Sequence, residues 1–296
     1  MEKENRYPKS EKKLINNKNM QRTFEISSVE EYIKKVDEIY QHESECKKED
    51  VKGKHLFFRG HPDKEYKLLP TILRGDKLNE KEILNDFHHY SPRHLHNSYD
   101  FEDDRIKILA EMQHNEIPTR LLDWSLAPLN ALFFAVSGQN ENGKDAEVIV
   151  FNPWNYNSEI VDYRKFPNIH NVHIHARALL SATSDFGYIN DYIQAKYRYK
   201  DLEEHHLEKP FAFVSNFLND RILHQRGAFT IHGTDKKDLG EWAKFKDYSW
   251  RITIKSCAKR TIYDMLNKLY INHYSIYPDF PGMKQQINER KGLFNL

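Results

Sequence analysis

Apolar and polar positions recur along the chain with two different periods, which together predict a mixture of helices and strands. Apolar residues three and four positions apart are typical of helices with one buried face, and they occur at residues 29–40, 79–90 and 259–272. Short apolar or alternating runs are typical of strands, and they occur at residues 56–61, 146–152, 228–233 and 250–256. We therefore predict an α+β fold in which surrounding helices cover a small mixed β-sheet.

Residues 106–137 form two apolar stretches that are separated by a dense polar connection. The first stretch has helical spacing and brings His114 to the start of the connection. The second, residues 126–136, is apolar on almost every side, which predicts a buried helix with Ser125 or Asp123 as its N-cap. We expect this to be the central helix on which the sheet packs.

The polar connection supplies the first candidates for a functional site. Arg120 and Asp123 place opposite charges at the wall of the core, where an unpaired charge is costly. One interpretation is structural, with these two side chains pairing and capping the helix. The other is functional: His114 and Asp123 are candidate catalytic residues, since imidazole and carboxylate groups suit proton transfer. Its candidate ligand-binding residues are Thr119, Arg120, Trp124 and Ser125.

Two other segments contribute candidates to the same site. Arg59 ends the strand predicted at residues 56–61 and precedes Gly60, so a planar guanidinium stands beside exposed backbone, as recognition of a phosphate or carboxylate requires. Arg221 lies on a short helical pattern that leads into the strand at 228–233. Gln225 occupies that junction, where its amide either contacts a ligand or caps the turn.

Composition narrows the classes of partner. The formal net charge of the 296 residues is +1, so the chain lacks the global basic field that drives non-specific binding to nucleic acid or anionic membranes. No uninterrupted apolar run approaches the roughly 20 residues needed to span a bilayer. Cys46 and Cys257, far apart in sequence, form neither a disulfide framework nor a CxxC half-site. We expect a cytoplasmic protein without a membrane partner.

Histidine-rich stretches do not predict a metal site, because their spacing matches no zinc pattern and no cysteine lies near them. They include His88, His89, His94, His96, His170, His173 and His175. Residues 1–24 read as a flexible polar arm, and residues 25–296 as one domain. Within that domain residues 153–210, with a helix at 188–199, read as a helical insertion or cap.

Four motifs, taken in order, resemble those of the FRG domain family, named for its F-R-G motif. They are FFRG at 57–60, QHNEIPTRLLDWS at 113–125 with PLNALFFA after it, RILHQRGAF at 221–229, and YPDFPGMKQQI beginning at Tyr277. The chain departs from the family where Asn115 and Glu116 replace Gly and a Tyr-like residue, and where Ser125 replaces Thr. The resemblance covers about residues 25–290 and implies a bacterial protein with a role in phage defence or as a toxin.

The Arg59–Gly60 pair also resembles the first NAD-contacting motif of arginine-type ADP-ribosyltransferases. That resemblance implies that Arg59 binds phosphate and that His114 or Asp123 handles a proton or orients ribose. It also implies that Gln225, the third candidate catalytic residue, contacts the acceptor or the nicotinamide ribose. The expected Ser-Thr-Ser strand is absent from the sequence, and Gln225–Gly227 lacks the glutamate. Three hypotheses follow: an enzyme acting on NAD, another nucleotide or nucleic acid; a non-catalytic nucleotide-sensing or protein-interaction module; or a purely structural polar network.

Overall fold

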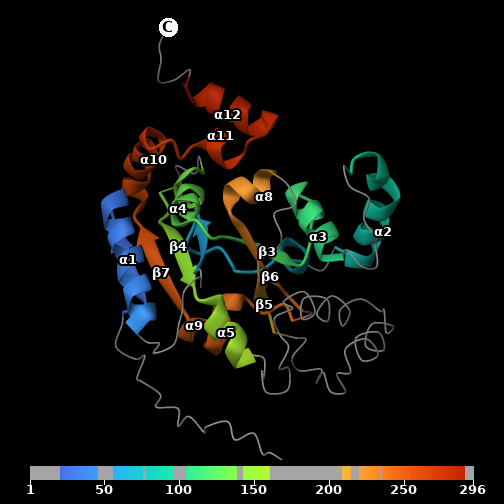
Figure 1. The fold of residues 1–296 in the computed structure, drawn as a ribbon, viewed down its shortest axis with the longest axis horizontal. Helices are drawn as coiled ribbons and strands as arrows, with labels where there is room; N and C mark the ends of the chain where they lie inside the picture. Colours follow the sequence, from blue (N-terminus) through green and yellow to red (C-terminus); the bar gives the residue numbers. More distant parts are fainter. Residues whose placement is uncertain are drawn as a thin grey trace, which may run out of the picture.

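The structure, a computed structural model, describes residues 21–45, 56–75, 78–95, 105–138, 143–160, 209–214, 220–233 and 235–290. Within these residues seven strands form one mixed sheet in the order β1-β7-β4-β2-β3-β6-β5 (Figure 1). The strands are β1 (Thr23–Ile26), β2 (Phe57–His61), β3 (Leu121–Ser125), β4 (Ala146–Phe151), β5 (Phe211–Phe213), β6 (Gly227–Ile231) and β7 (Ser249–Ile254). The predicted α+β class and mixed sheet are confirmed, although the sheet is larger than the small one expected.

Helices surround this sheet on both faces (Figure 1). They are α1 (Val29–Glu45), α2 (Glu80–Tyr90), α3 (Arg105–His114), α4 (Pro128–Val136), α5 (Pro153–Ile160), α8 (Asp220–Gln225), α9 (Ala243–Asp247), α10 (Lys259–Lys268), α11 (His273–Ile276) and α12 (Phe280–Arg290). Short 3-10 turns lie at Thr71–Leu73, Ser91–Arg93, Leu239–Glu241 and Ser256–Ala258.

The pairing of β2 divides the sheet into two halves. β2 is antiparallel to β4 over five consecutive residue pairs, whereas it pairs with β3 only through Phe58 and Ser125. β3 in turn pairs with β6 over five residues. We call β1, β7, β4 and β2 the first half-sheet, and β3, β6 and β5 the second half-sheet. The boundary between β2 and β3, which we call the seam, therefore has few main-chain bonds.

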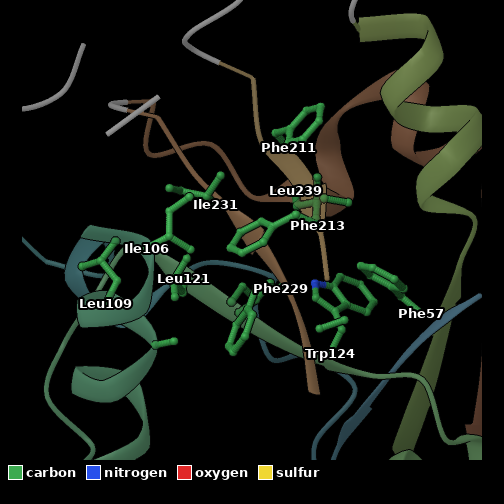
Figure 2. Close-up of a cluster of buried hydrophobic side chains, with 14 of the residues drawn as sticks. Phe57, Ile106, Leu109, Leu121, Trp124, Phe211, Phe213, Phe229, Ile231 and Leu239 are labelled. Carbon is green, nitrogen blue, oxygen red and sulfur yellow. The ribbon is translucent and has the colours of Figure 1, made fainter. Parts of the chain in front are cut away.

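Alternation along the strands creates two hydrophobic cores, one on each face of the sheet. Phe58 belongs to the core formed with α1, α4 and α10, and its neighbour Phe57 belongs to the core formed with α3, α5 and α9. Figure 2 shows the second core, where the rings of Phe57 and Trp124 lie side by side with centroids 6.5 Å apart. Phe57 of the first half-sheet and Trp124 of the second therefore pack together across the seam.

Helix α4 is the buried central helix that the sequence predicts. Its buried residues are Asn130, Ala131, Leu132, Phe133, Ala135 and Val136. It lies so close to β2 that a Cβ atom on Gly60 would stand 2.0 Å from the carbonyl oxygen of Ala131. Gly60 is thus needed for packing between helix and strand.

The start of α4 differs from the prediction. The helix begins at Pro128 with Ala127 as its N-cap, and neither Asp123 nor Ser125 caps it. Both residues instead belong to β3, whose five residues pair with β6. The Ser125 hydroxyl accepts a hydrogen bond of 3.0 Å from the Ala127 N–H and donates one of 2.7 Å to the Gln225 carbonyl. Asp123 and Ser125 thus pair with β6 as part of a strand and do not cap α4.

Two predicted segments are described only in part. Thr23 and Phe24, the last residues of the predicted arm, belong to β1, and residues 1–20 lie outside the described residues. Residues 161–208 also lie outside them, and with them the helix predicted at 188–199 and the histidines His170, His173 and His175. Among the described helices, none has the length and apolar character needed to cross a membrane.

Candidate functional site

A cavity of about 250 Å³ opens at the seam, where β2 and β3 part. Its wall is built by β2, α3, β3, α4, α8, β6 and the side chain of Tyr277. The polar side chains on this wall are Arg59, Gln113, His114, Asp123, Ser125, Arg221 and Gln225. The aromatic side chains on the same wall include those of Phe58, Phe134, Phe229 and Tyr277. The cavity thus combines charged groups with aromatic rings.

Eight of the ten residues proposed from the sequence line this one cavity: Arg59, Gly60, His114, Asp123, Trp124, Ser125, Arg221 and Gln225. They come from the strand-to-glycine motif, the central segment and the third motif, which are far apart in the chain. Thr119 and Arg120 do not line it. The roles of the eight residues are taken up as a proposal below.

Arg59 is the cation at the seam. Its Nε donates a 2.9 Å hydrogen bond to His61 Nε2, and its Nη1 donates to the Asp123 carbonyl oxygen across the seam. Burial, opposed by the charge of Asp123 and assisted by that of Arg74, lowers the pKa of Arg59 to about 10, so the group is charged at neutral pH. Within the described part of the chain, Nη2 has no hydrogen-bond acceptor and is available to a ligand.

Asp123 is held by a short relay of hydrogen bonds. Gln113 Nε2 donates to Asp123 Oδ2 at 2.7 Å, and the Thr119 hydroxyl donates to Gln113 Oε1. The Leu121 N–H donates to that hydroxyl at 3.1 Å. Because the Asp123 carboxylate only accepts, the amide nitrogen of Gln113 must face it, which leaves Gln113 Oε1 to accept the Thr119 proton. Thr119 therefore acts through Gln113 and not by touching the cavity.

His114 and Arg221 form the edge of the cavity beside Tyr277. Arg221 Nη1 donates to the His114 carbonyl oxygen at 3.1 Å, and the Arg221 guanidinium lies over the Tyr277 ring at 4.6 Å. Burial and then the charge of Arg221 lower the pKa of His114 below its ordinary 6.5, so the ring is neutral at pH 7. Its Nδ1 is buried without a hydrogen-bond partner among the described residues.

The expected pairing of Arg120 with Asp123 is wrong. Arg120 Nε donates to Glu80 Oε1 at 2.7 Å, its Nη2 donates to Glu80 Oε2, and its Nη1 donates to the His232 carbonyl at 2.9 Å. Arg120 is 4% exposed and stands just before β3, whereas Asp123 is exposed on the strand. Its partner Glu80 comes from α2, so the pairing depends on tertiary structure that local sequence does not reveal.

Hydrogen bonds to neighbouring elements hold Trp124 and the main chain of Gln225 in place. Trp124 Nε1 donates to the Thr230 hydroxyl at 3.1 Å, which joins β3 to β6. The Gln225 carbonyl accepts from Ser125, while the Gln225 side chain lines the cavity. Arg226 follows with φ of 51°, a left-handed conformation that turns the chain from α8 into β6. Trp124 and Ser125 therefore connect elements of the second half-sheet and its helix.

Nine lining residues were not among the candidates from sequence, and they include Gln113, Phe134 and Tyr277. Gln113 belongs to the polar set of the central segment, and its position next to His114 was the available signal. Tyr277 opens the last FRG-like motif, which was the signal for that residue. Phe134 gave no signal, because it is one apolar residue in an apolar helix.

Metal binding receives no support from the side chains that the structure describes, which contain no group of three or more His, Cys, Asp or Glu residues arranged to hold an ion.

Comparison with known families adds one match. Residues 54–144 match the FRG domain. The FRG match includes β2, α2, α3, β3 and α4, and hence Arg59, Gln113, His114 and Asp123. Arg221, Gln225 and Tyr277 lie after it, so the FRG segment and the remainder of the chain build the cavity together. No curated protein and no solved structure matches the chain.

Proposed function

We propose that the cavity binds an anionic nucleotide ligand and that NAD is the first candidate. The observation that carries the proposal is the charge of the wall: its described residues include two arginines, Arg59 and Arg221, and one carboxylate, Asp123. A guanidinium with a free edge, such as that of Arg59, suits the oxygens of a phosphate. The aromatic part of the wall suits a base or nicotinamide ring.

The size of the cavity limits how much of such a ligand it encloses. At about 250 Å³ it is smaller than the roughly 300–1,000 Å³ of pockets that enclose whole ligands. A ring with its sugar, or a sugar with a phosphate, fits this volume better than a complete dinucleotide. The rest of a dinucleotide would extend from the cavity over the surface beside Arg59.

The proposed reaction is attack by a hydroxyl or water oxygen on the ribose carbon that carries the nicotinamide, which forms a carbon–oxygen bond, breaks the bond to the nicotinamide nitrogen and releases neutral nicotinamide. Asp123, fixed by Gln113, is the carboxylate that would orient the ribose or stabilise positive charge developing on it. His114, neutral at pH 7, would accept the proton of the attacking hydroxyl or water. Loss of NAD through such a reaction would account for the phage-defence or toxin role that the FRG resemblance implies.

A non-catalytic sensor is the second candidate function, and one observation favours it. Asp123 is the only carboxylate on the described wall of the cavity. A mechanism with paired carboxylates, one acid and one base or nucleophile, therefore has no second group here. Ligand binding without turnover needs only Arg59, Arg221 and the aromatic wall.

The test is a thermal-shift screen of the wild type and two variants against NAD, ADP-ribose, ATP, GTP and short RNA. A ligand present at 100 times its Kd stabilises the native state by about 2.7 kcal/mol. Arg59→Ala should abolish the shift. Arg260→Ala is the matched control, because Arg260 is an exposed arginine paired with Asp264 on α10. The absence of a shift with every ligand would overturn the nucleotide proposal.

Turnover is then separated from binding with Asp123→Asn. If the protein is an enzyme, nicotinamide is released from NAD by the wild type and not by Asp123→Asn, while the thermal shift with ADP-ribose persists in both. If the protein is a sensor, neither releases nicotinamide and both bind.

A further inference from the structure

His61 stands directly behind the cation of the proposed site. It is two residues after Arg59 on β2, so both side chains lie on the same face of the strand. His61 is 3% exposed and does not line the cavity. Its Nε2 accepts the 2.9 Å hydrogen bond from Arg59 Nε. The imidazole therefore contacts the Nε edge of the arginine without lining the cavity.

The row of polar groups continues from His61 across the first half-sheet. Glu147 on β4 is the register partner of His61, and its Oε1 lies 3.5 Å from His61 Nδ1. Arg251 on β7 donates from Nη1 to both oxygens of Glu147 at 2.7 Å. Three strands thus place Arg251, Glu147, His61 and Arg59 in one row that ends at the seam.

This row determines the protonation of His61. A guanidinium has no acceptor, so the Nε2 that receives the Arg59 N–H must carry a lone pair. The proton of the neutral ring then sits on Nδ1 and faces the carboxylate of Glu147. A protonated ring would turn an N–H towards the N–H of Arg59 and would place two cations side by side.

We propose that His61 is a positioning residue for ligand binding by Arg59. The His61 acceptor and the Asp123 carbonyl fix the guanidinium at Nε and Nη1, which sets its plane and leaves Nη2 as the corner open to an anion. An arginine that is already ordered loses less conformational freedom when it binds. This inference rests on the proposed function, namely that the cavity takes a phosphate-bearing ligand.

Two substitutions separate positioning from simple filling of space. His61→Gln keeps an oxygen that can accept from Arg59 and an N–H₂ that can face Glu147, whereas His61→Leu keeps similar bulk and removes both. With ADP-ribose as the probe, His61→Leu should bind about tenfold more weakly than the wild type. His61→Gln should stay within about threefold. Equal affinity of His61→Leu and wild type would overturn the inference, as would equal losses in both variants.

The dependence of ADP-ribose affinity on pH gives a second readout, which would not change if His61 only filled space. The charged groups near His61 are Arg59, Glu147 and Arg251. The ring of Tyr66 also faces it, with 6.1 Å between the centroids of the His61 and Tyr66 rings. Burial lowers the pKa of His61 below its ordinary 6.5, so the window lies in acid. As the pH falls from 6.5 to 4, wild-type affinity for ADP-ribose should fall further than that of His61→Gln, because only the wild type can protonate this position. His114 titrates in both proteins and cancels in the comparison. Identical profiles would contradict the inference.

The Arg59 Nε–H resonance tests the contact without any ligand. The signal is assigned by its loss in Arg59→Lys, and it should be protected from solvent exchange in the wild type and in His61→Gln but not in His61→Leu. If the wild type binds no ADP-ribose, the proposed function fails and so does the role in ligand binding. Protection lost in His61→Leu would then still establish that His61 holds the guanidinium, and unchanged protection would overturn that as well.

Discussion

Arg120 and Glu80 form a two-pronged ion pair, in which Nε and Nη2 of the arginine each donate to one oxygen of the carboxylate. The Arg120 side chain is 4% exposed and that of Glu80 16%, so solvent screens the pair only weakly. The third donation, to the His232 carbonyl, joins the pair to the end of β6. Arg120 therefore fastens α2 to the second half-sheet, away from the cavity wall.

Arg120→Met should destabilise the fold by about 3–5 kcal/mol, because Glu80 is left without its partner. Asp123→Asn should cost less than about 1 kcal/mol, since Asp123 is exposed and an amide oxygen can still accept from Gln113. Urea unfolding of the two variants measures the difference. A loss as large in Asp123→Asn as in Arg120→Met would mean that both residues are mainly structural.

Gly60→Ala should destabilise the protein by about 3 kcal/mol or more, through overpacking. The added Cβ would meet main-chain atoms of α4 at 2.0 and 2.6 Å, and backbone cannot move aside as a flexible side chain can. Gly75→Ala is the control, because nothing lies within 4 Å of a Cβ at that position. The midpoint of thermal unfolding should drop only in the first variant, and equal midpoints would show that α4 can withdraw from β2.

Thr119→Val should cost about 1–3 kcal/mol, because it leaves the Leu121 N–H without its acceptor in a buried position. Thr119→Ser keeps a hydroxyl and should lose much less. The pair should also differ in the site: without the hydroxyl, Gln113 Oε1 loses its donor and the Gln113 side chain is held only by Asp123. Urea unfolding gives the stability difference, and similar losses in the two variants would show that the Thr119 methyl group matters more than the relay.

Stability should fall in mild acid because His232 stays neutral in the folded protein. Burial, aided by the charges of Arg120 and Arg59, lowers the pKa of His232 from 6.5 to about 3. The unfolded chain takes up this proton below pH 6.5 and the folded chain does not, so the buried ring costs nothing above pH 6.5 and lowers the free energy of unfolding progressively as pH falls towards 3. The slope is about 1.4 kcal/mol per pH unit for each such histidine.

Urea unfolding at pH 7 and pH 5 checks this dependence, with His232→Asn as the comparison. The variant should lose less stability between the two pH values than the wild type. It should retain some pH dependence, since burial also lowers the pKa of His61 and His114. Equal losses in wild type and variant would assign the acid sensitivity to other groups.

Local pattern predicts most of the fold where one face of an element is apolar. The predicted strand at 146–152 appears as β4, and the predicted helix at 79–90 appears as α2 with Asn79 as its N-cap. β3 was missed because Leu121, Leu122 and Trp124 are buried on both faces of the strand and give no alternation. The sequence pattern instead assigns residues 121–125 to the polar connection and N-cap before the helix predicted at 126–136.

Much of the site could be proposed from sequence, because charged residues beside apolar segments are conspicuous. The partners of these charged residues could not be predicted, since hydrogen bonds and close contacts between charged groups link residues that are distant in the chain. Arg120 meets Glu80, and His61 meets Glu147, only once α2 and β4 have taken their places. Arg59 was a candidate from the sequence, while His61 behind it carried no signal apart from its place on the same strand.

The seam gives ligand binding a mechanical meaning. β2 and β3 share one residue pair, so Arg59 and Asp123 lie on two half-sheets that few main-chain hydrogen bonds connect. Arg59 already donates a hydrogen bond across the seam to the carbonyl oxygen of Asp123. A molecule that binds Arg59 on one side and Asp123 or Gln225 on the other would cross-link the two half-sheets. Such binding would restrict relative motion of the half-sheets at the boundary where strand pairing is sparsest.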